Sequence, residues 1–311
     1  MPTQTYPAGE TPRLIITGCE GTLQIETSDQ PGFTVEPALA QAVSREDRAL
    51  VVHAARGDMR LRVPAATELA IENHAGDLRI ESIDGTVWLR DIAGDVFVSG
   101  AGALRIERDQ LLRDRVWSPH RPRRDVEARN IGAAEIAEVH GSLVLADVRG
   151  ATVGEIGGNA RASGVAEDLR LGDVGGNCEI SQVGGALEVA NIGGNCRIEQ
   201  ISGSLRAGHI GGSAEIRAAG PLLKLGNVGG NLTLTDAPLG QEAAAALSGS
   251  IAVGGSARIE LPKQADLTIN AIVGGGVSGP GVRTGPGIRT IVYGGGAAHL
   301  RLTVGGHLTL A

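Results

Sequence analysis

Residues 174–196, VGGNCEISQVGGALEVANIGGNC, decide the fold of this chain, because they span one full period of a repeat that runs through its middle. Apolar residues precede a Gly-Gly pair at a constant interval of eighteen positions, at Ile156, Val174, Ile192, Ile210 and Val228. Further apolar residues divide each period into two equal halves, at Val165, Val183 and Ile201. A fixed period of this length is typical of stacked repeat architectures, in which each unit buries its apolar face against its neighbours.

Apolar and polar residues alternate after the glycines of each half. Across full periods the apolar positions align in columns: Ala160, Cys178, Cys196, Ala214 and Leu232; Ala162, Ile180, Ile198, Ile216 and Leu234; and Leu169, Leu187, Leu205 and Leu223. Alternation with a period of two is typical of a half-buried strand. A triangular hexapeptide helix would repeat its apolar positions every six residues, which this chain does not. The sequence therefore predicts an all-β fold, a parallel β-solenoid (β-helix) whose coils each span eighteen positions and are built from two 9-residue Gly-Gly half-repeats.

Polar residues also align at the period. We expect an amide ladder on one edge, in which each side chain bonds to the neighbouring coil, formed by Asn159, Asn177, Asn195 and Asn231 with Ser213 in the gap. Exposed positions place opposite charges on successive coils, at Arg161, Glu179, Arg197 and Glu215, and at Arg170, Glu188, Arg206 and Lys224. Such exposed pairs contribute only about 0.2 to 1 kcal/mol each, so we expect the apolar columns to supply most of the stability.

The repeat extends beyond the middle of the chain. Upstream, glycine-led units step by nine at Gly76, Gly85 and Gly94. We expect residues 1–70 to form an irregular β N-terminal cap and residues 71–311 to form the solenoid. Two segments break the period, an Arg-rich loop at 108–129 and an Ala-rich insertion at 241–248.

Composition excludes several classes of function. The 311 residues carry a formal net charge of −7, which argues against nonspecific nucleic-acid binding. Two Trp, two Tyr and two Phe leave few platforms on which sugars or bases could stack. No apolar run approaches the roughly 20 residues of a membrane span, and the first residues show no basic start followed by an apolar segment. We therefore expect no membrane span, and a cytoplasmic location by default.

The repeat carries no sign of metal or catalytic chemistry. Nonapeptides that begin with Gly-Gly resemble the calcium-binding β-roll, in which an Asp at position six binds Ca²⁺. Here position six is Ile180, Ile198 or Ile216, so we expect no metal. The columns place Cys178 above Cys196 as buried thiols, because in-register parallel neighbours have poor disulfide geometry. No Ser/His/Asp or HExxH pattern is present, so we expect no enzyme, cofactor or small-molecule ligand. A polysaccharide-acting β-helix enzyme is the third hypothesis, since its cleft can be assembled from several coils.

Two surface features have both a structural and a functional interpretation. The loop at 108–129 is either a solvated excursion or a recognition loop for a partner, and its candidate contact residues are Arg113, Trp117, Arg121, Arg123 and Arg124. A second strip has small residues at Gly172, Ala190, Gly208 and Gly226. It is either a corner where each strand bends or a flat face against which another protomer packs.

Val63-Pro64-Ala65 and the units that follow, LAIENHAGDLRIESIDGTVWLRDIAGDVFVSG, resemble the bacterial putative-adhesin family of β-strand-repeat proteins. The resemblance covers residues 60–107 and extends to the rest by period. It implies a β-solenoid without catalytic residues. The chain also resembles, more weakly, the bactofilins, cytoplasmic β-helical proteins that polymerise end to end.

The end of the sequence suggests how the chain would assemble. Apolar residues run to Ala311 without a polar cap, and the candidate assembly residues are Leu300, Leu302, Leu308 and Leu310. An uncovered last coil is a template for strand pairing. We therefore expect a non-enzymatic structural or scaffold protein that self-associates through its open C-terminal coil or flat face. The alternative is an adhesin-like module that binds a protein partner through the loop at 108–129.

Overall fold

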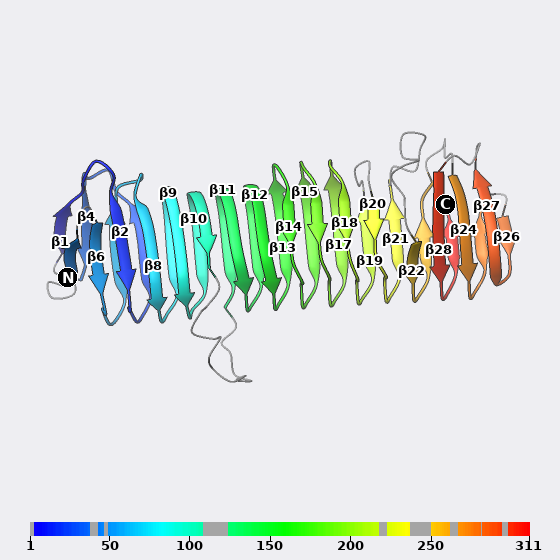
Figure 1. Cartoon of the computed structure of the whole chain (residues 1–311), viewed down its shortest axis with the longest axis horizontal. Coiled ribbons are helices and arrows are strands. Elements are labelled where there is room, and N and C mark those ends of the chain that lie inside the picture. The colour runs from blue at the N-terminus through cyan, green and yellow to red at the C-terminus, as the bar shows by residue number, and fades with distance from the viewer. Residues whose placement is uncertain are drawn as a thin grey trace. The chain divides into compact units, whose positions relative to one another are not determined.

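The computed structural model describes residues 3–37, 43–46, 49–107, 124–217, 223–236, 250–261, 267–280, 282–293 and 298–311. All regular elements in these ranges are strands, so the expectation of an all-β fold is confirmed (Figure 1). The chain divides into two compact units, Met1–Ile156 and Gly157–Ala311, and parallel strand pairs dominate the ladders of each. The Ala-rich insertion at 241–248 lies outside the described residues, as do residues 108–123 of the Arg-rich loop.

Unit 1 is built around four long parallel strands that lie side by side in Figure 1. These four are β9 (Leu78–Ile92), β10 (Val96–Ile106), β11 (Val126–Val139) and β12 (Leu143–Ile156). The shorter strands before them are β1 (Gln4–Pro7), β2 (Arg13–Thr17), β3 (Leu23–Thr27), β4 (Gly32–Glu36), β5 (Val43–Glu46), β6 (Ala49–His53), β7 (Met59–Val63) and β8 (Glu68–His74).

The break in the repeat is shorter than the sequence suggests. Val126 and Ala128, expected in the loop at 108–129, are buried in β11 and pair with Val96 and Val98 of β10. Their apolar side chains belong to the buried columns of the core, so the loop ends before Val126. Arg129 also belongs to β11, where its Nε lies 2.5 Å from Glu127 Oε1.

The first strands of unit 1 do not stack in sequence order. β2 and β3 lie between two later pairs, with β6 and β7 on one side and β8 and β9 on the other, all in parallel register. On the far side of β6 and β7 the chain direction reverses, because β5 runs antiparallel to β6 and β4 antiparallel to β7. β1 adds a further antiparallel strand beside β4.

In unit 2 the columns read from the sequence are neighbours in space. Cys178 pairs with Ala160 on one side and Cys196 on the other, and Ile180 pairs with Ala162 and Ile198. The strands of this regular part are β13 (Ala160–Val165), β14 (Leu169–Leu171), β15 (Cys178–Val183), β16 (Leu187–Val189), β17 (Cys196–Ile201), β18 (Leu205–Ala207), β19 (Ala214–Arg217), β20 (Leu223–Leu225) and β21 (Leu232–Thr235). Alternation of buried aliphatic and exposed polar residues thus places the core between the strand ladders.

Single left-handed residues bend these strands, a feature that sequence reasoning missed. In β15 and β17 the residues with positive φ are Gln182 at 58° and Gln200 at 55°, in register with Gly164 at 65°. In unit 1 the same register position holds Ser82, Gly100, Asn130 and Asp147, all with positive φ. Gln has no particular preference for this conformation, so the column carries little sequence signal.

The close packing of backbone explains the Gly-Gly pairs. A Cβ placed on Gly193 would overlap the carbonyl oxygen of Gly175, and one on Gly211 would overlap that of Gly193. Gly211 N donates to Ile192 O at 2.8 Å, so each glycine also holds the ladder together at this point. Only a residue without a side chain allows such an approach.

The end of unit 2 overturns the expectation of an open C-terminal coil. Its strands are β22 (Ser250–Val253), β23 (Ala257–Ile259), β24 (Leu267–Val273), β25 (Val277–Gly279), β26 (Val282–Thr284), β27 (Gly287–Tyr293), β28 (Ala298–Val304) and β29 (Leu308–Leu310). β28 lies between β22 and β24 (Figure 1), in parallel register with both. β29 lies in the same way between β23 and β25. The last strands in the sequence therefore have partners on both sides. Beyond them β27 runs antiparallel to β24, and β26 antiparallel to β25.

Candidate functional site

The residues expected to mediate assembly are core residues. Leu300, Leu302, Leu308 and Leu310 are between 0% and 2% exposed. Leu308 N donates to Gly276 O at 2.9 Å on one side, and Ala311 N donates to Ile259 O at 3.0 Å on the other. These leucines fill a layer inside the ladder and present no surface to a second molecule.

Of the residues expected to bind a partner, the structure describes one. Arg124 is 3% exposed, and its Nη1 donates to the carbonyl oxygen of Ile92. This buried side chain supports the start of β11 and cannot reach a partner at the surface. Arg113, Trp117, Arg121 and Arg123 lie outside the described residues.

The strip of small residues lies between a short strand and an isolated bridge. Gly172, Ala190 and Gly208 each follow the last residue of a strand and precede the residue that forms the next parallel bridge. Asn191 Nδ2 donates to Asp173 Oδ1 at 2.8 Å, and His209 N donates to Asn191 Oδ1 at 3.1 Å. These bonds connect successive positions along the strip, and the corner and packing-face interpretations both stay predictions.

The outermost strand of unit 2 exposes an apolar patch. Ile272 is 53% exposed, Ile288 76% and Val292 56%, and these are the exposed large apolar side chains among the described residues. Ile272 of β24 lies directly opposite Ile288 of β27. On its other side β27 pairs with no described strand. An edge strand of seven residues with exposed apolar side chains is a template for pairing with another chain.

Arg289 faces the inner side of this strand and is held by its own turn. Its Nε donates to Thr284 Oγ1 at 3.3 Å, its Nη1 to Ile288 O at 2.9 Å and its Nη2 to Pro286 O at 3.2 Å. An inward-pointing charge is one way in which proteins discourage edge pairing. Here the guanidinium is satisfied by the connection between β26 and β27, so it leaves the outer apolar side chains accessible.

The edge strands of unit 1 have the opposite character. β5 has the sequence VSRE, and its last two residues, Arg45 and Glu46, are exposed. β1 is four residues long and ends in Pro7. Short, charged and proline-containing edges are protected against pairing, so β27 differs from both edges of unit 1.

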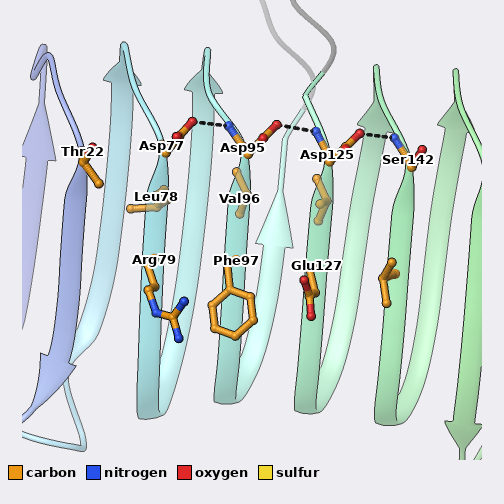
Figure 2. Close-up of a pocket in the computed structure, with 12 residues that line it drawn as sticks. Thr22, Asp77, Leu78, Arg79, Asp95, Val96, Phe97, Asp125, Glu127 and Ser142 are labelled. Atoms are coloured by element: carbon orange, nitrogen blue, oxygen red, sulfur yellow. Dashed lines mark hydrogen bonds between the residues drawn. The ribbon is translucent and has the colours of Figure 1, made fainter.

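A groove crosses the starts of the long strands of unit 1, with a volume of about 460 Å³. Figure 2 shows its row of carboxylates, Asp77, Asp95 and Asp125, which ends at Ser142. Asp95 N donates to Asp77 Oδ1 at 3.0 Å, Asp125 N to Asp95 Oδ1 at 2.9 Å, and Ser142 N to Asp125 Oδ1 at 2.6 Å. One oxygen of each carboxylate thus accepts the backbone N–H of the residue that directly precedes the next strand.

Two further side chains line this groove. The Arg79 guanidinium carbon lies 4.5 Å from the centroid of the Phe97 ring, and Arg79 Nε donates to Glu81 Oε1 at 2.7 Å. The cation–π contact stabilises Phe97, which is partly exposed. The groove therefore combines an acidic row with one covered aromatic ring.

A similar groove of about 570 Å³ follows the expected amide ladder in unit 2. Asn177 N donates to Asn159 Oδ1 and Asn195 N to Asn177 Oδ1, both at 2.8 Å. The ladder continues through Ser213, Asn231 and Ser256. The expected ladder is confirmed: each side-chain oxygen accepts the backbone N–H of the next residue in the ladder.

The alternating charges of unit 2 also meet as expected. Arg161 Nη2 lies 2.6 Å from Glu179 Oε2, and Arg197 lies 2.8 Å from Glu199 and 3.8 Å from Glu215. Glu199, followed by Glu215, raises the pKa of Arg197 above its ordinary value. Each of these side chains is exposed by about a third or more, and exposed ion pairs contribute little to stability.

Two observations bear on metal and nucleophilic chemistry among the described residues. No three of their His, Cys, Asp or Glu side chains gather as metal ligands. Ser278 Oγ lies 3.0 Å from His307 Nε2, but His307 Nδ1 accepts from Gly276 N at 3.2 Å. This bond leaves the ring proton on Nε2, which then donates to the serine and cannot remove its proton.

The two stacked cysteines are buried thiols, as expected. Cys178 and Cys196 are each 2% exposed and unbridged. The contact with Cys196, followed by burial, raises the pKa of Cys178 well above its ordinary value. A thiol that stays protonated is a poor nucleophile. The burial of both cysteines is that of core side chains.

No stretch of the described chain forms a helix that could cross a lipid bilayer.

Comparisons with known proteins add little to this picture. No model of a protein family matches the chain, and no curated protein is similar to it in sequence. A solved structure from Clostridium sporogenes, named a "putative cell adhesion protein", shares 10% identity over 99% of this chain and 98% of its own. Its TM-score of 0.16 is too low to carry any argument about this chain. None of these comparisons supports the likeness to bactofilins.

Proposed function

We propose that this chain is a non-enzymatic structural protein, a β-solenoid with 18 residues per coil, that self-associates through the edge strand β27. The bonds of the Asn ladder join partners that lie 18 residues apart, which supports this coil length. The parallel registers of β13 to β21 repeat with the same spacing. The edge proposed here replaces the C-terminal coil that the sequence suggested, because β29 has a partner strand on each side.

The observation that carries the proposal is the apolar patch on the outermost strand pair. Ile288 and Val292 project from the outer face of β27, and Ile272 lies beside Ile288 on β24. Two copies of the chain would bring six such side chains together. Full burial of an Ile or Val side chain contributes roughly 1.5 to 3 kcal/mol, and new backbone hydrogen bonds along the edge contribute about 0.5 to 1.5 kcal/mol each.

Association also has a cost. Loss of translational and rotational freedom opposes binding by about 4 to 15 kcal/mol. Side chains on the outer face lose only part of their exposed area when two edges pair; association in the micromolar range would correspond to a net free energy of about −8 kcal/mol. A concentration series from about 1 to about 500 μM spans this range.

The test is the oligomeric state of the protein and of a charged variant of the edge. We expect sedimentation velocity to show a concentration-dependent oligomer for the wild-type chain, and a monomer for Ile288→Lys combined with Val292→Lys. The two substitutions would place like charges directly opposite each other across the paired edges, which is destabilising. A wild-type chain that stays monomeric throughout the series would contradict the proposal.

The matched control is Thr303→Lys. Thr303 is exposed on the same outer face, but on β28, which is separated from β27 by β24. This variant adds charge to the face without touching the edge, so we expect it to associate like the wild type. If it also abolished association, the edge would not be the surface involved.

A further inference from the structure

We infer that β27 of one copy pairs with β27 of a second copy, antiparallel and centred on Thr290, and that this contact closes as a dimer. The inference rests on the proposed function and specifies its partner and geometry. On the outer face of β27 the residues are Ile288, Thr290 and Val292, all exposed. The order apolar, polar, apolar reads the same in both directions about Thr290.

An antiparallel pair is the arrangement in which this pattern complements itself. A two-fold axis through Thr290, perpendicular to the sheet, places Ile288 of each copy opposite Val292 of the other, and Thr290 opposite Thr290. The same axis keeps the outer faces of both sheets on one side, so the two apolar patches merge. Alternation has a period of two, so a shift by one residue would place outer side chains against inner ones.

Neighbouring strands extend the patch across the contact. Ile272 lies opposite Ile288, and Thr268 lies opposite Val292, in the pairing of β24 with β27. In the proposed dimer each Ile272 therefore begins a row that crosses Ile288 and then reaches the partner copy's Val292. Both rows are apolar at the dimer centre, which is where side chains contribute most to binding.

The edges of unit 1 are poor alternatives for β27. β5 ends in the exposed pair Arg45 and Glu46, and β1 ends in Pro7. Neither offers apolar side chains at the spacing of Ile288 and Val292. Pairing of β27 with a different edge of a second copy would be head-to-tail and would continue into a filament. Pairing of β27 with β27 of a second copy leaves neither of the two edges free.

Cysteine cross-linking tests the register. Opposite residues of an antiparallel pair have Cα atoms about 4.5 to 5.5 Å apart, within the range that a disulfide spans. We expect Thr290→Cys to form a covalent dimer on mild oxidation. A mixture of Ile288→Cys and Val292→Cys should cross-link between the two variants. Ile288→Cys alone should not, because its two copies would lie about 14 Å apart along the strands.

The control variant is Thr303→Cys, at an exposed threonine on the same face of β28. Two copies of this residue would lie about 28 Å apart, because five strand spacings separate them across the sheet and about 14 Å separates them along the strands, so we expect at least about tenfold less covalent dimer than with Thr290→Cys. The native Cys19, Cys178 and Cys196 are buried, and the wild-type chain should give no cross-link.

The possible results separate the two claims. A monomer at every concentration would overturn the proposed function itself. An oligomer in which Thr290→Cys fails to cross-link, or which grows beyond two copies with concentration in light scattering, would overturn this geometry while leaving self-association in place. A dimer mass together with the expected cross-links would support both.

Discussion

At the scale of single residues, the side chains of both polar ladders accept backbone N–H groups, but the two ladders use different acceptors. In unit 1 the acceptors are the carboxylates of Asp77, Asp95 and Asp125, and in unit 2 they are the amides of Asn159, Asn177 and Asn195. Both kinds of oxygen accept one backbone N–H. Carboxylates on successive strands, about 4.8 Å apart, also repel each other.

Substitution of Asp95 should separate these two effects. Asp95→Ala removes the acceptor for Asp125 N and should lower the free energy of unfolding by about 1 kcal/mol. Asp95→Asn keeps the acceptor and removes the charge, so its stability should equal or exceed that of the wild type by a few tenths of a kcal/mol, with the gain shrinking as salt screens the repulsion. Urea unfolding at low and high salt measures both. If Asp95→Asn lost as much stability as Asp95→Ala, the carboxylate charge itself would be required.

A buried histidine in unit 1 makes stability depend on pH. His74 is 1% exposed, its Nε2 lies 3.4 Å from Asp77 O, and its Nδ1 has no hydrogen-bond partner. Burial is the main cause that lowers the pKa of His74 below the ordinary value of 6.5. The unfolded chain therefore takes up the proton first as pH falls. The contribution of neutral His74 to the free energy of unfolding is complete above pH 6.5. It declines as the pH falls below that value, by at most about 1.4 kcal/mol per pH unit.

Thermal unfolding at about pH 7.5 and about pH 5.5 tests this. The drop in midpoint between the two pH values should be smaller in His74→Leu than in the wild type, because no proton can bind at that site. His53→Leu is the control, since His53 is exposed on β6. An equal drop in all three proteins would show that other groups cause the acid sensitivity.

Residue-level sequence reasoning succeeded where a position repeats with one chemical role. The Asn column and the Gly column recur every 18 residues, and each has a role that only a few residue types can fill. The acidic ladder of unit 1 was missed because the spacing there varies: Asp95 lies 18 residues after Asp77 but 30 residues before Asp125. Arg124 was misjudged because its charge suggested exposure, while the structure gives it a buried acceptor at Ile92.

At the scale of elements, each unit combines an antiparallel strand pair with a parallel ladder whose strands are out of sequence order. In unit 1 the antiparallel strands β4 and β5 follow a parallel ladder into which β2 and β3 are inserted. In unit 2 the antiparallel strands β26 and β27 follow a ladder into which β28 and β29 are inserted. In unit 1 the reversal lets the chain pass from one side of β2 and β3 to the other. In unit 2 it brings the chain back to fill the layer between β22 and β24.

Alternation of apolar and polar residues could predict these strands but not their order. β24 and β28 both have seven residues and alternate in the same way, as LTINAIV and AHLRLTV. Either would fit beside β22, because a parallel ladder selects for buried aliphatic side chains and not for a particular sequence. The inference of an open C-terminal coil failed for this reason: it assumed that the last strands in the sequence are the last in the stack.

At the scale of the whole molecule, the range of the contacts differs between the middle and the end of unit 2. In the regular part, ladder partners such as Asn177 and Asn195 are 18 residues apart. At the end, His307 bonds to Ser256, 51 residues away, and to Gly276, 31 residues away. Contacts between distant residues require the closure of longer loops, which costs more conformational entropy before the contact forms.

We therefore expect β28 and β29 to dock last when the protein folds. They can pair on both sides only after β24 and β25 have left a layer free beside β22 and β23, whereas β15 and β17 need only their immediate neighbours. Pulsed hydrogen–deuterium exchange during refolding measures this order. Peptides from 298–311 should gain protection after peptides from 178–201, and in the native state they should open at lower denaturant concentration. If 298–311 gained protection at the same time as 178–201, this expectation would be wrong. β28 and β29 would then dock in the same cooperative step in which the regular ladder forms.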